Sequence, residues 1–277
     1  MRIAITGASG FIGRRLVSKL KVEGNEVQLV SLRTAPREQD LAGCGAVIHL
    51  AGEPVAQRWT SAARERIRAS RVDATRSLVA ALQKSPPATL ISASAVGYYG
   101  PRGDEILTEK ASPASDFLGQ IAVDWEREAQ KAEAFGVRVV TLRIAMVLGR
   151  DGGALKKMLP PFRLGLGGRI GTGKQWISWI HLEDLISMIE FALRTPISGP
   201  LNASAPNPVI NAEFTRELAR AVHRPAILPV PLFLLKLLFG QMAEILYASN
   251  RVIPEAALNA GFPFRFPEIS GAFQDLL

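Results

Sequence analysis

Short apolar runs alternate with amphipathic segments along the first half of the chain. The apolar runs fall at residues 3–5, 26–31, 46–50, 89–93 and 137–143, and their length suits buried strands. The segments between them place apolar residues at helical spacing, notably over residues 11–20, 60–84 and 116–135. Strands that alternate with helices of this length predict an α/β fold with a doubly wound parallel sheet.

The pattern changes after about residue 150. Pairs of glycines and prolines, Gly152-Gly153 and Pro160-Pro161, open a glycine-rich stretch that we expect to be irregular and to cover the carboxyl edge of the sheet. Helices beginning near Leu182 and over residues 211–223, with a short strand at 200–203, follow it. We therefore predict a dinucleotide-binding domain over residues 1–150. A smaller substrate-covering lobe, interleaved with the sheet, should take up residues 151–277.

A glycine-rich turn follows the first apolar run and opens the first helix. Gly7, Gly10 and Gly13 have the spacing at which a strand-to-helix turn presents N–H groups and a helix N-terminus to a pyrophosphate. The alternative is a tight turn that holds no ligand. The residues we expect to contact a dinucleotide here are Gly7, Ser9, Gly10, Phe11, Ile12 and Gly13, with Leu50, Ala51 and Gly52 after the third apolar run.

The end of the second apolar run indicates which dinucleotide is bound. A site for NAD usually places an acidic residue there to hold the ribose 2′-hydroxyl. This chain has Ser31, Leu32 and Arg33 instead, and a guanidinium pairs well with a 2′-phosphate. We therefore predict that Ser31 and Arg33 contribute to a site for NADP(H). The alternative is that Arg33 is an ordinary surface arginine.

Composition and charge limit the other classes of function. The chain has 277 residues and a formal net charge of +8, with a single cysteine, Cys44. One cysteine excludes an intrachain disulfide and indicates a reducing compartment, so we expect a cytoplasmic protein. The longest apolar stretch, residues 229–240, is interrupted by Lys236 and is shorter than the ~20 residues that cross a bilayer. We expect a buried helix or a subunit contact there, and no membrane partner.

The positive charge does not indicate nucleic-acid binding. Arginines concentrate between Arg58 and Arg76, and Arg64, Arg68 and Arg71 would share one face of a continuous helix. The aromatic residues that stack on bases are missing around them, apart from Trp59. A solvated helix or a contact with cofactor phosphates is the simpler interpretation. No spacing of His, Cys, Asp and Glu indicates a metal site.

Several longer motifs occur along the chain: TGASGFIG, VIHLAGEPV, SASAVGYYGPRGD, LRIAMVLGRDGGAL, the GLGG…GxGxQWxSWIHxxDL segment and HRPAILPVP…AGFPFRFP. They make the chain resemble the extended short-chain dehydrogenase/reductases, in their nucleoside-diphosphate-sugar epimerase-like branch. More closely, it is similar to the atypical group labelled "epimerase family protein". The resemblance implies an NADP-type Rossmann domain, a characteristic C-terminal lobe, and a homodimer formed through residues 60–84 and 116–135. The segment between Arg33 and Gly45 is short, so the usual third strand should be reduced or missing, with Asp40-Leu41 the only candidate for its contacts with adenine.

The same resemblance implies a serine and a Tyr-x-x-x-Lys pair that transfers a proton while nicotinamide exchanges a hydride. Ser94 matches the serine, but Phe117 and Ile121 stand where the tyrosine and the lysine belong, and no Tyr-x-x-x-Lys occurs in the chain. The substitutes that we consider for proton transfer are Tyr98, Tyr99 and Glu53, each of which also has a structural interpretation. An ordered water is a further option. His49, His181 and His223 are expected to be structural, with a catalytic base as the alternative for His181.

Two classes of function follow. The first is an NADP(H)-dependent oxidoreductase or epimerase-like enzyme that acts on a small hydroxyl or carbonyl compound, with a nucleotide sugar as one option. The second is a catalytically silent NADPH-binding sensor that acts through a protein partner. The missing Tyr-x-x-x-Lys pair favours the second class, whereas the glycine- and tryptophan-rich lobe favours the first, which is the function we predict.

Overall fold

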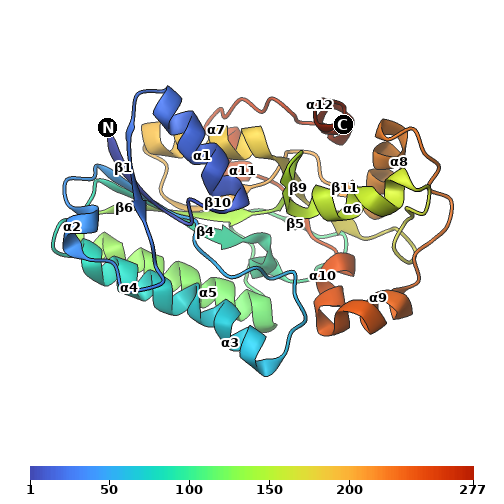
Figure 1. Cartoon of the computed structure of the whole chain (residues 1–277), viewed down its shortest axis with the longest axis horizontal. Helices are drawn as coiled ribbons and strands as arrows, with labels where there is room; N and C mark the ends of the chain where they lie inside the picture. Colours follow the sequence, from blue (N-terminus) through green and yellow to red (C-terminus); the bar gives the residue numbers. More distant parts are fainter.

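A six-stranded parallel sheet forms the centre of the molecule (Figure 1). The computed structural model describes the backbone of residues 1–277 and every side chain except those of residues 238 and 239. The strand order is β10-β6-β4-β3-β1-β2, so the direction of winding reverses between β1 and β3, where such folds bind ligands. The strands are β1 (Arg2–Thr6), β2 (Glu26–Val30), β3 (Ala46–His49), β4 (Thr89–Ala95), β6 (Arg138–Ile144) and β10 (Gly199–Ala203).

Helices cover both faces of the sheet, which confirms the predicted doubly wound fold. Helices α1 (Phe11–Val22) and α7 (Leu182–Arg194) pack on one face, and α4 (Val72–Leu82) and α5 (Phe117–Gln130) on the other (Figure 1). Successive residues of β1 alternate between the two layers: Ile3 and Ile5 pack toward α1, and Ala4 packs toward α4. The strands read as continuous apolar runs because both faces are buried.

The sheet ends at β2 on its outer edge among the described residues, as the short segment after Arg33 predicted. A single-turn helix, α2 (Glu38–Leu41), stands in place of a third strand. Its Leu41 is buried against Val30 and Leu78 and so closes the end of the core beneath β2.

The long helix predicted over residues 60–84 is wrong in one respect, because the structure contains two helices. Helix α3 (Ser61–Ala69) ends before Ser70, and α4 begins at Val72. Both intervening side chains bind the loop after β3: Ser70 Oγ accepts from the N–H of Glu53 at 2.9 Å, and Arg71 Nη1 donates to the Glu53 carbonyl at 3.0 Å. Arg71 therefore turns under that loop instead of sharing a face with Arg64 and Arg68.

The stretch expected to be irregular after residue 150 contains a helix, α6 (Gly153–Arg163). Leu155, Leu159 and Phe162 lie on one side of α6 and are buried in the core of the C-terminal lobe. This spacing of four and three residues is helical, and its burial outweighs the two prolines. Pro160 and Pro161 both fall in the last turn, where each removes an N–H that would otherwise bond to a carbonyl four residues earlier.

The rest of the lobe consists of short elements around the carboxyl end of the sheet. Because α7 and β10 return to the central sheet, the second half of the chain is interleaved with the first; a domain boundary at residue 150 stays a prediction. The smaller elements are β5 (Ile106–Leu107), β7 (Met146–Gly149), β8 (Trp176–Ile177), β9 (Trp179–His181), β11 (Val209–Ile210), α8 (Asn211–Ala221), α9 (Leu232–Phe239), α10 (Ala243–Tyr247), β12 (Arg251–Val252), α11 (Glu255–Asn259) and α12 (Ile269–Leu276), with 3₁₀ turns η1 (Val96–Tyr99), η2 (Lys131–Phe135) and η3 (Gly240–Met242).

Helix α9 is not the buried helix that the apolar stretch suggested. Phe233 is 72% exposed and Leu237 is 73% exposed, so α9 presents apolar side chains to solvent. The alternative expectation, a subunit contact, stays a prediction. Within the described part of the chain, every helix is too short or too polar to cross a membrane.

A buried chain of hydrogen bonds joins the carboxyl ends of β1 and β3 to α4. Thr6 Oγ1 lies 2.6 Å from His49 Nδ1, and His49 Nε2 lies 2.9 Å from Thr75 Oγ1. Since Thr75 donates its own proton to the Arg71 carbonyl, His49 donates through Nε2 and accepts from Thr6 through Nδ1. Burial lowers the pKa of His49 to about 4, and the charge of Arg71 acts in the same direction. His49 is therefore a neutral structural residue, as expected.

Two glycine-to-alanine substitutions should have opposite effects on stability. A Cβ on Gly13 would lie 2.2 Å from the Gly7 carbonyl oxygen, which is backbone and cannot move aside, so Gly13→Ala should lower the free energy of unfolding by about 2–3 kcal/mol. Gly271, in α12, has open space around its Cβ position, so Gly271→Ala should raise the free energy of unfolding by about 0.5–1 kcal/mol. Urea denaturation measures both; equal effects would contradict the close contact at Gly13.

Neutral His49 should make stability fall with acidification. Its pKa is 6.5 in the unfolded chain and about 4 when folded, so its contribution is complete above pH 6.5 and is lost as the pH falls toward 4. The expected loss is about 3 kcal/mol. Urea denaturation between pH 7 and pH 4 should show a steeper loss for the wild type than for His49→Gln. Parallel profiles for the two proteins would exclude this role.

Candidate cofactor and substrate site

The glycine-rich turn lies between β1 and α1, against the end of β3. Gly7 has a φ of +70°, and a Cβ there would stand 2.6 Å from the carbonyl carbon of Leu50. Only glycine fits this conformation and this approach without strain. Gly10 is the N-cap of α1 and has no side-chain cap, so the first N–H groups of the helix are left for a ligand. The close contacts of Gly7 and Gly13 thus build the geometry that suits an anion.

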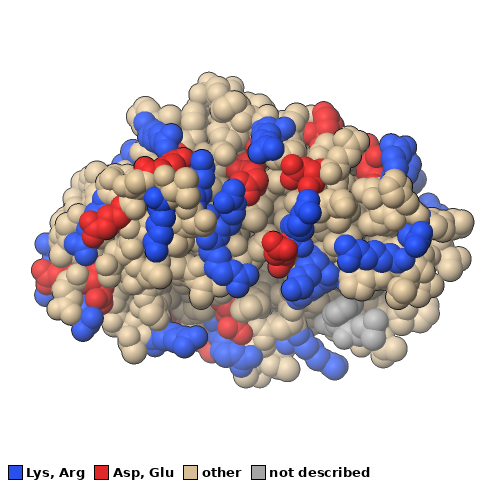
Figure 2. Space-filling model, turned by 45° about the horizontal axis from the view of Figure 1, so that its top comes forward, with Lys and Arg blue, Asp and Glu red and all other residues tan. Residues whose placement is uncertain are grey.

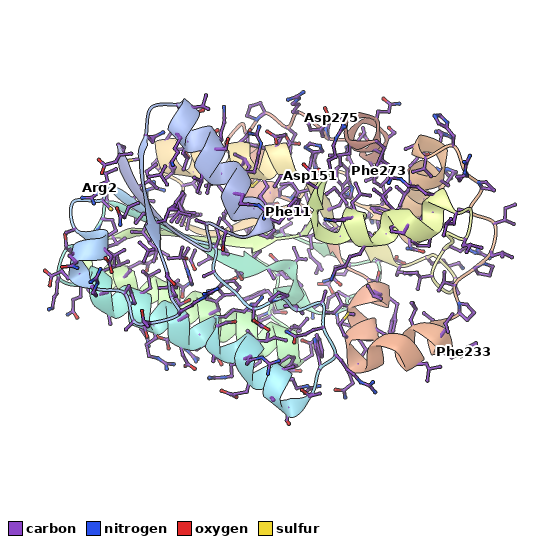
Figure 3. All side chains as sticks on the ribbon, in the orientation of Figure 1. Arg2, Phe11, Asp151, Phe233, Phe273 and Asp275 are labelled. Carbon is purple, nitrogen blue, oxygen red and sulfur yellow. The ribbon has the colours of Figure 1, made fainter. Side chains whose placement is uncertain are left out.

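The side chain of Phe11 points away from the sheet into a slot made by glycines. Cβ atoms at Gly149, Gly152 and Gly153 would each come within 2.9 Å of its ring. Phe11 thus connects the start of α1 to the turn between β7 and α6, where Figure 3 shows it near Asp151. Its side chain has a packing role, so a cofactor contact at Phe11 would use its backbone N–H.

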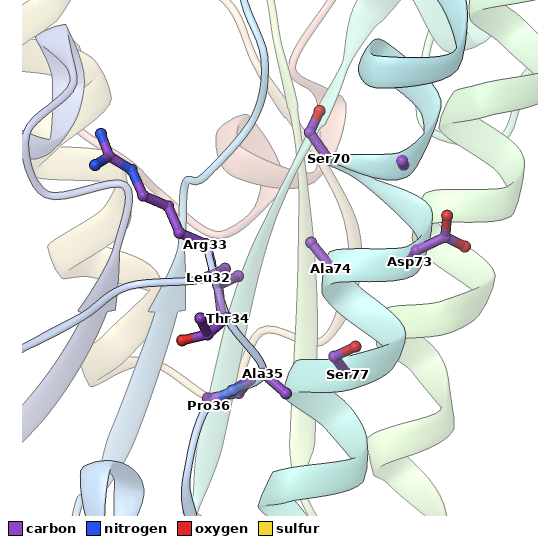
Figure 4. A pocket seen from close by; sticks show the side chains of 10 residues that line it. Leu32, Arg33, Thr34, Ala35, Pro36, Ser70, Asp73, Ala74 and Ser77 are labelled. Atoms are coloured by element: carbon purple, nitrogen blue, oxygen red, sulfur yellow. The ribbon is translucent and has the colours of Figure 1, made fainter.

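A cavity of about 320 Å³ lies between the end of β2 and the junction of α3 with α4 (Figure 4). Arg33, Thr34 and Pro36 line one wall, and Ser70 and Asp73 line the other. Arg33 is exposed, and its guanidinium has no ion pair or hydrogen bond among the described residues. Figure 4 shows the Arg33 side chain extending away from the wall formed by Ser70 and Asp73, so its unpaired guanidinium lies at the margin of the cavity. This charge stands beside the second strand, where the sequence predicted a 2′-phosphate contact.

Asp40 and Leu41, the expected adenine contacts, do not line this cavity. Asp40 accepts from Nε and Nη2 of Arg37 at 3.2 and 2.9 Å, which lowers the pKa of its carboxyl, and Leu41 is buried in the core. Because the sheet has lost its usual third strand, the wall opposite Arg33 comes from α3 and α4 instead.

One face of the sheet becomes more polar toward its carboxyl end. Beneath α4 and α5, the apolar row Ala4, Val47, Leu90 and Val139 is followed two residues later by Thr6, His49, Ser92 and Thr141. Two residues further on, Ser94 of β4 and Arg143 of β6 are neighbours in register. Parallel strands in register place such residues side by side, so the polar end of this face is a property of several strands together.

Ser94 and Arg143 belong to a buried cluster that includes Glu126, Tyr99 and Asn202. Ser94 Oγ donates to Glu126 Oε1 at 2.6 Å, and Arg143 donates to both Glu126 oxygens at 2.9 Å. Arg143 Nη1 also donates to the Tyr99 hydroxyl at 2.9 Å, and that hydroxyl donates to Asn202 Oδ1 at 2.6 Å. The cluster pairs its two charges and satisfies each hydroxyl, as burial requires.

Burial has opposite consequences for Tyr99 and Arg143. Desolvation raises the pKa of Tyr99 to about 12, although Arg143 acts against it, so Tyr99 stays a neutral phenol at physiological pH. Desolvation alone would lower the pKa of Arg143, but the hydrogen bonds and charge of Glu126 outweigh it and hold that pKa above its usual value. The cluster therefore keeps a fixed guanidinium beside Ser94 and Tyr99.

The structure brings together three of the four proposed catalytic residues. Tyr98 is half-buried, and its ring lies against Arg143, whose Cζ is 3.5 Å from the ring centroid. Ser94, Tyr98 and Tyr99 thus surround one guanidinium. Glu53 lies apart from them on the loop after β3, where its carboxylate accepts from Gln57 at 3.0 Å and stands 3.8 Å from Arg66.

Glu126, Arg143 and Asn202 were not predicted from the sequence as site residues. Arg143 had a usable signal, because a charged residue in the apolar run 137–143 must find a buried partner. Glu126 and Asn202 carried no such signal, since their partners come from β4, β6 and η1.

Residues at the positions of the missing Tyr-x-x-x-Lys pair have packing roles. The Phe117 ring lies 5.3 Å from that of Trp59 and 4.7 Å from the Arg64 guanidinium. Ile121 is buried. His181 is also buried: its Nδ1 accepts from the N–H of Glu183 at the start of α7, and its ring stacks on Phe266. No group of three or more His, Cys, Asp or Glu side chains able to hold a metal ion occurs in the described structure.

Comparison with known proteins agrees with these features. Residues 3–204 match the NAD dependent epimerase/dehydratase family, and residues 230–276 match a domain of unknown function, DUF1731. YfhF of Bacillus subtilis, an epimerase family protein, is 39% identical over 298 residues, covering 100% of this chain and 98% of its own. The chloroplastic SDR39U1 homolog of Arabidopsis thaliana is 36% identical over 302 residues, covering 100% and 87%.

Solved structures give the same picture. Human epimerase family protein SDR39U1, crystallised with NADPH, has a TM-score of 0.91 and 34% identity, covering 100% of this chain and 99% of that one. The UDP-glucose 4-epimerase of Thermus thermophilus in complex with NAD has a TM-score of 0.78, but its 17% identity shows the fold alone. The resemblance inferred from the sequence motifs is confirmed: the chain belongs to the NAD dependent epimerase/dehydratase family, together with relatives named epimerase family protein.

Proposed function

We propose that this protein binds NADP(H) and transfers a hydride between its nicotinamide and a small hydroxyl or carbonyl compound. The observation that carries the proposal is the end of β2, which has no acidic residue and leads into Arg33 on the wall of a cavity, with no partner for its guanidinium among the described residues. The end of β2 offers no carboxylate to a free 2′-hydroxyl, whereas the guanidinium of Arg33 suits a 2′-phosphate. The carboxylate that lines the cavity, Asp73 on the opposite wall, is paired with Arg76 at 2.9 Å. The NADPH in the human relative supports the same cofactor.

The chain would hold the cofactor at three places. The turn from Gly7 to Gly13, with Ser9 and the N–H groups of Phe11 and Ile12, would bind the pyrophosphate. Ser31 and Arg33 would hold the 2′-phosphate end. Leu50, Ala51 and Gly52 would contact the middle of the cofactor. The Arg71 guanidinium lies under this loop, 3.4 Å from where a Gly52 Cβ would stand. The cofactor, when bound, supplies the hydride acceptor or donor.

Ser94 would position the substrate oxygen next to the fixed charge of Arg143. The Ser94 hydroxyl donates its proton to Glu126, so its lone pairs would accept a hydrogen bond from a substrate hydroxyl. To hold a carbonyl oxygen, which only accepts, the Ser94 proton would have to turn from Glu126 to the substrate. Tyr98 is more accessible than Tyr99, and its hydroxyl has no hydrogen bond among the described residues. We assign proton transfer to Tyr98 in the place of the missing tyrosine, with Tyr99 and Glu53 as the alternatives to be excluded.

Family membership favours this function over the catalytically silent sensor. A small-molecule substrate and a cytoplasmic location belong to the proposal, and the Arabidopsis relative carries the word chloroplastic in its name. The homodimer also stays a prediction. The outer sides of α4 and α5 bear ion pairs such as Arg76–Glu128 and Arg127–Asp124, so pairing through them would bury charged groups.

Replacing Arg33 should weaken the binding of NADPH and leave the binding of NADH nearly unchanged. A guanidinium–phosphate contact contributes about 1.5–3 kcal/mol, so Arg33→Ala should raise the Kd of NADPH about 10- to 100-fold and leave the Kd of NADH within about twofold. Arg37→Ala is the matched control, because Arg37 is exposed and paired with Asp40 outside the cavity. Titration calorimetry gives the constants. Equal loss for both cofactors, or no loss in Arg33→Ala, would contradict the assignment.

Ser94 and Tyr98 can be tested with NADPH and a panel of sugar nucleotides and small carbonyl compounds. With any compound that the wild type reduces, Ser94→Ala and Tyr98→Phe should each lower kcat at least ~100-fold, the usual size of an acid–base contribution, with the Kd of NADPH unchanged. Tyr99→Phe should retain most of the activity. Full activity in Tyr98→Phe would exclude its role, and a panel in which no compound consumes NADPH would favour the silent protein.

A further inference from the structure

Several large apolar side chains protrude together from the C-terminal lobe. They come from two segments, the loop after α6 and the stretch that leads into α9. Each is at least 64% exposed, and Figure 3 shows one of them, Phe233, at the outer edge of the lobe. We call this surface the apolar patch; its members are Leu164, Leu166, Ile227, Leu228, Phe233 and Leu237.

The two segments lie side by side and are joined by hydrogen bonds to backbone carbonyls. The N–H of Val230 donates to the Arg169 carbonyl at 2.7 Å, and Arg224 Nε donates to the Arg163 carbonyl at 3.2 Å. Gly168 approaches the Leu228 carbonyl so closely that a Cβ has no room. These contacts hold the loop after α6 against the residues that lead into α9. Monomeric proteins seldom expose a contiguous apolar surface of this kind unless it binds something.

The two segments that form the patch carry charge of one sign. Residues 152–182 and 218–243, which contain the whole patch, include no aspartate or glutamate. Figure 2 shows basic side chains beside uncharged surface on the right of the molecule, where α6 and α9 lie. Among the described residues, only one of the basic side chains in these segments, Arg220, forms an ion pair. The basic residues are Lys156, Lys157, Arg163, Arg169, Lys174, Arg220, Arg224 and Lys236.

We propose that the apolar patch docks on an anionic lipid bilayer. Apolar side chains that enter the boundary between head groups and acyl chains, ringed by lysines and arginines at the level of the phosphates, are the usual design of a peripheral membrane site. Helix α9, with eight residues, would lie in the plane of the interface, since it is far too short to span it. The sequence predicted no membrane partner for want of a spanning segment, but a peripheral contact needs none.

A second copy of the chain fits this surface less well. A two-fold interface places the same patch on both partners, so the unpaired cations of one copy would face those of the other. Cores of protein interfaces are depleted of lysine, and like charges brought together are unfavourable. An anionic surface complements both features of the patch, its apolar centre and its basic border.

Vesicle binding tests the proposal. The full-length protein is sedimented with sucrose-loaded vesicles of phosphatidylcholine alone, or with about 30 mol% phosphatidylserine. We expect binding to the anionic vesicles that is at least ~10-fold stronger than to the neutral ones and that weakens at high salt. The double substitution Phe233→Gln and Leu237→Gln should lower binding to anionic vesicles at least ~10-fold. Both side chains are largely exposed, so the melting temperature should not change.

Matched control variants distinguish binding through the patch from nonspecific adsorption to vesicles. Val22→Gln removes an apolar side chain that is 84% exposed on α1, outside the patch, and should leave vesicle binding unchanged. Lys156→Gln with Lys157→Gln should weaken binding, whereas Lys21→Gln on α1 should not. Equal binding to neutral and anionic vesicles, or full binding by the Phe233→Gln/Leu237→Gln variant, would overturn the proposal. So would light scattering that shows a dimer which this variant dissociates, because a second copy would then cover the patch.

Discussion

The contact of the glycine-rich turn with the end of β3 is the constraint on which the candidate site depends. Gly7 can adopt its positive φ and approach Leu50 only without a side chain, and Gly13 must lie directly on the Gly7 carbonyl. These two contacts bring the N-terminus of α1 to the point where the winding of the sheet reverses. The hydrogen-bond chain through His49 then ties both strand ends to α4. The anion site, the cavity at Arg33 and the loop at Gly52 all take their positions from this junction.

A second constraint is the buried charge of Arg143. A guanidinium inside a parallel sheet must be paired, and Glu126 of α5 provides the carboxylate. The pair then determines what the neighbouring hydroxyls can do: Ser94 donates to Glu126, and Tyr99 is held neutral between Arg143 and Asn202. In the related enzymes that the motifs resemble, a lysine provides the charge near the reacting tyrosine. Here Arg143 of β6 lies against the Tyr98 ring in place of that lysine. The proton transfer that we propose for Tyr98 depends on this replacement.

Much of the fold could be predicted from the sequence, because the apolar runs have strand length and the glycine spacing is specific to one kind of turn. Two predictions failed where long-range contacts outweighed local pattern. The break at Ser70 and Arg71 depends on hydrogen bonds to the distant Glu53 backbone, and the burial of Leu155, Leu159 and Phe162 outweighs the two prolines of α6. The site was only partly predictable for the same reason. Arg33 belongs to a local motif. Glu126 and Asn202 become site residues only through contacts with β4, β6 and η1, which no local pattern predicts.

A crystal structure with NADP⁺ soaked in would test the central claim most directly, at the two ends of the cofactor. We expect the 2′-phosphate of the bound cofactor to contact Arg33 at the cavity beside β2. We also expect nicotinamide C4 to face Ser94 and Tyr98, with space for a substrate between them. Adenosine bound away from Arg33 would contradict the assignment of the cofactor. Phe117 and other apolar side chains closed over C4 would contradict hydride transfer and leave a bound but idle cofactor.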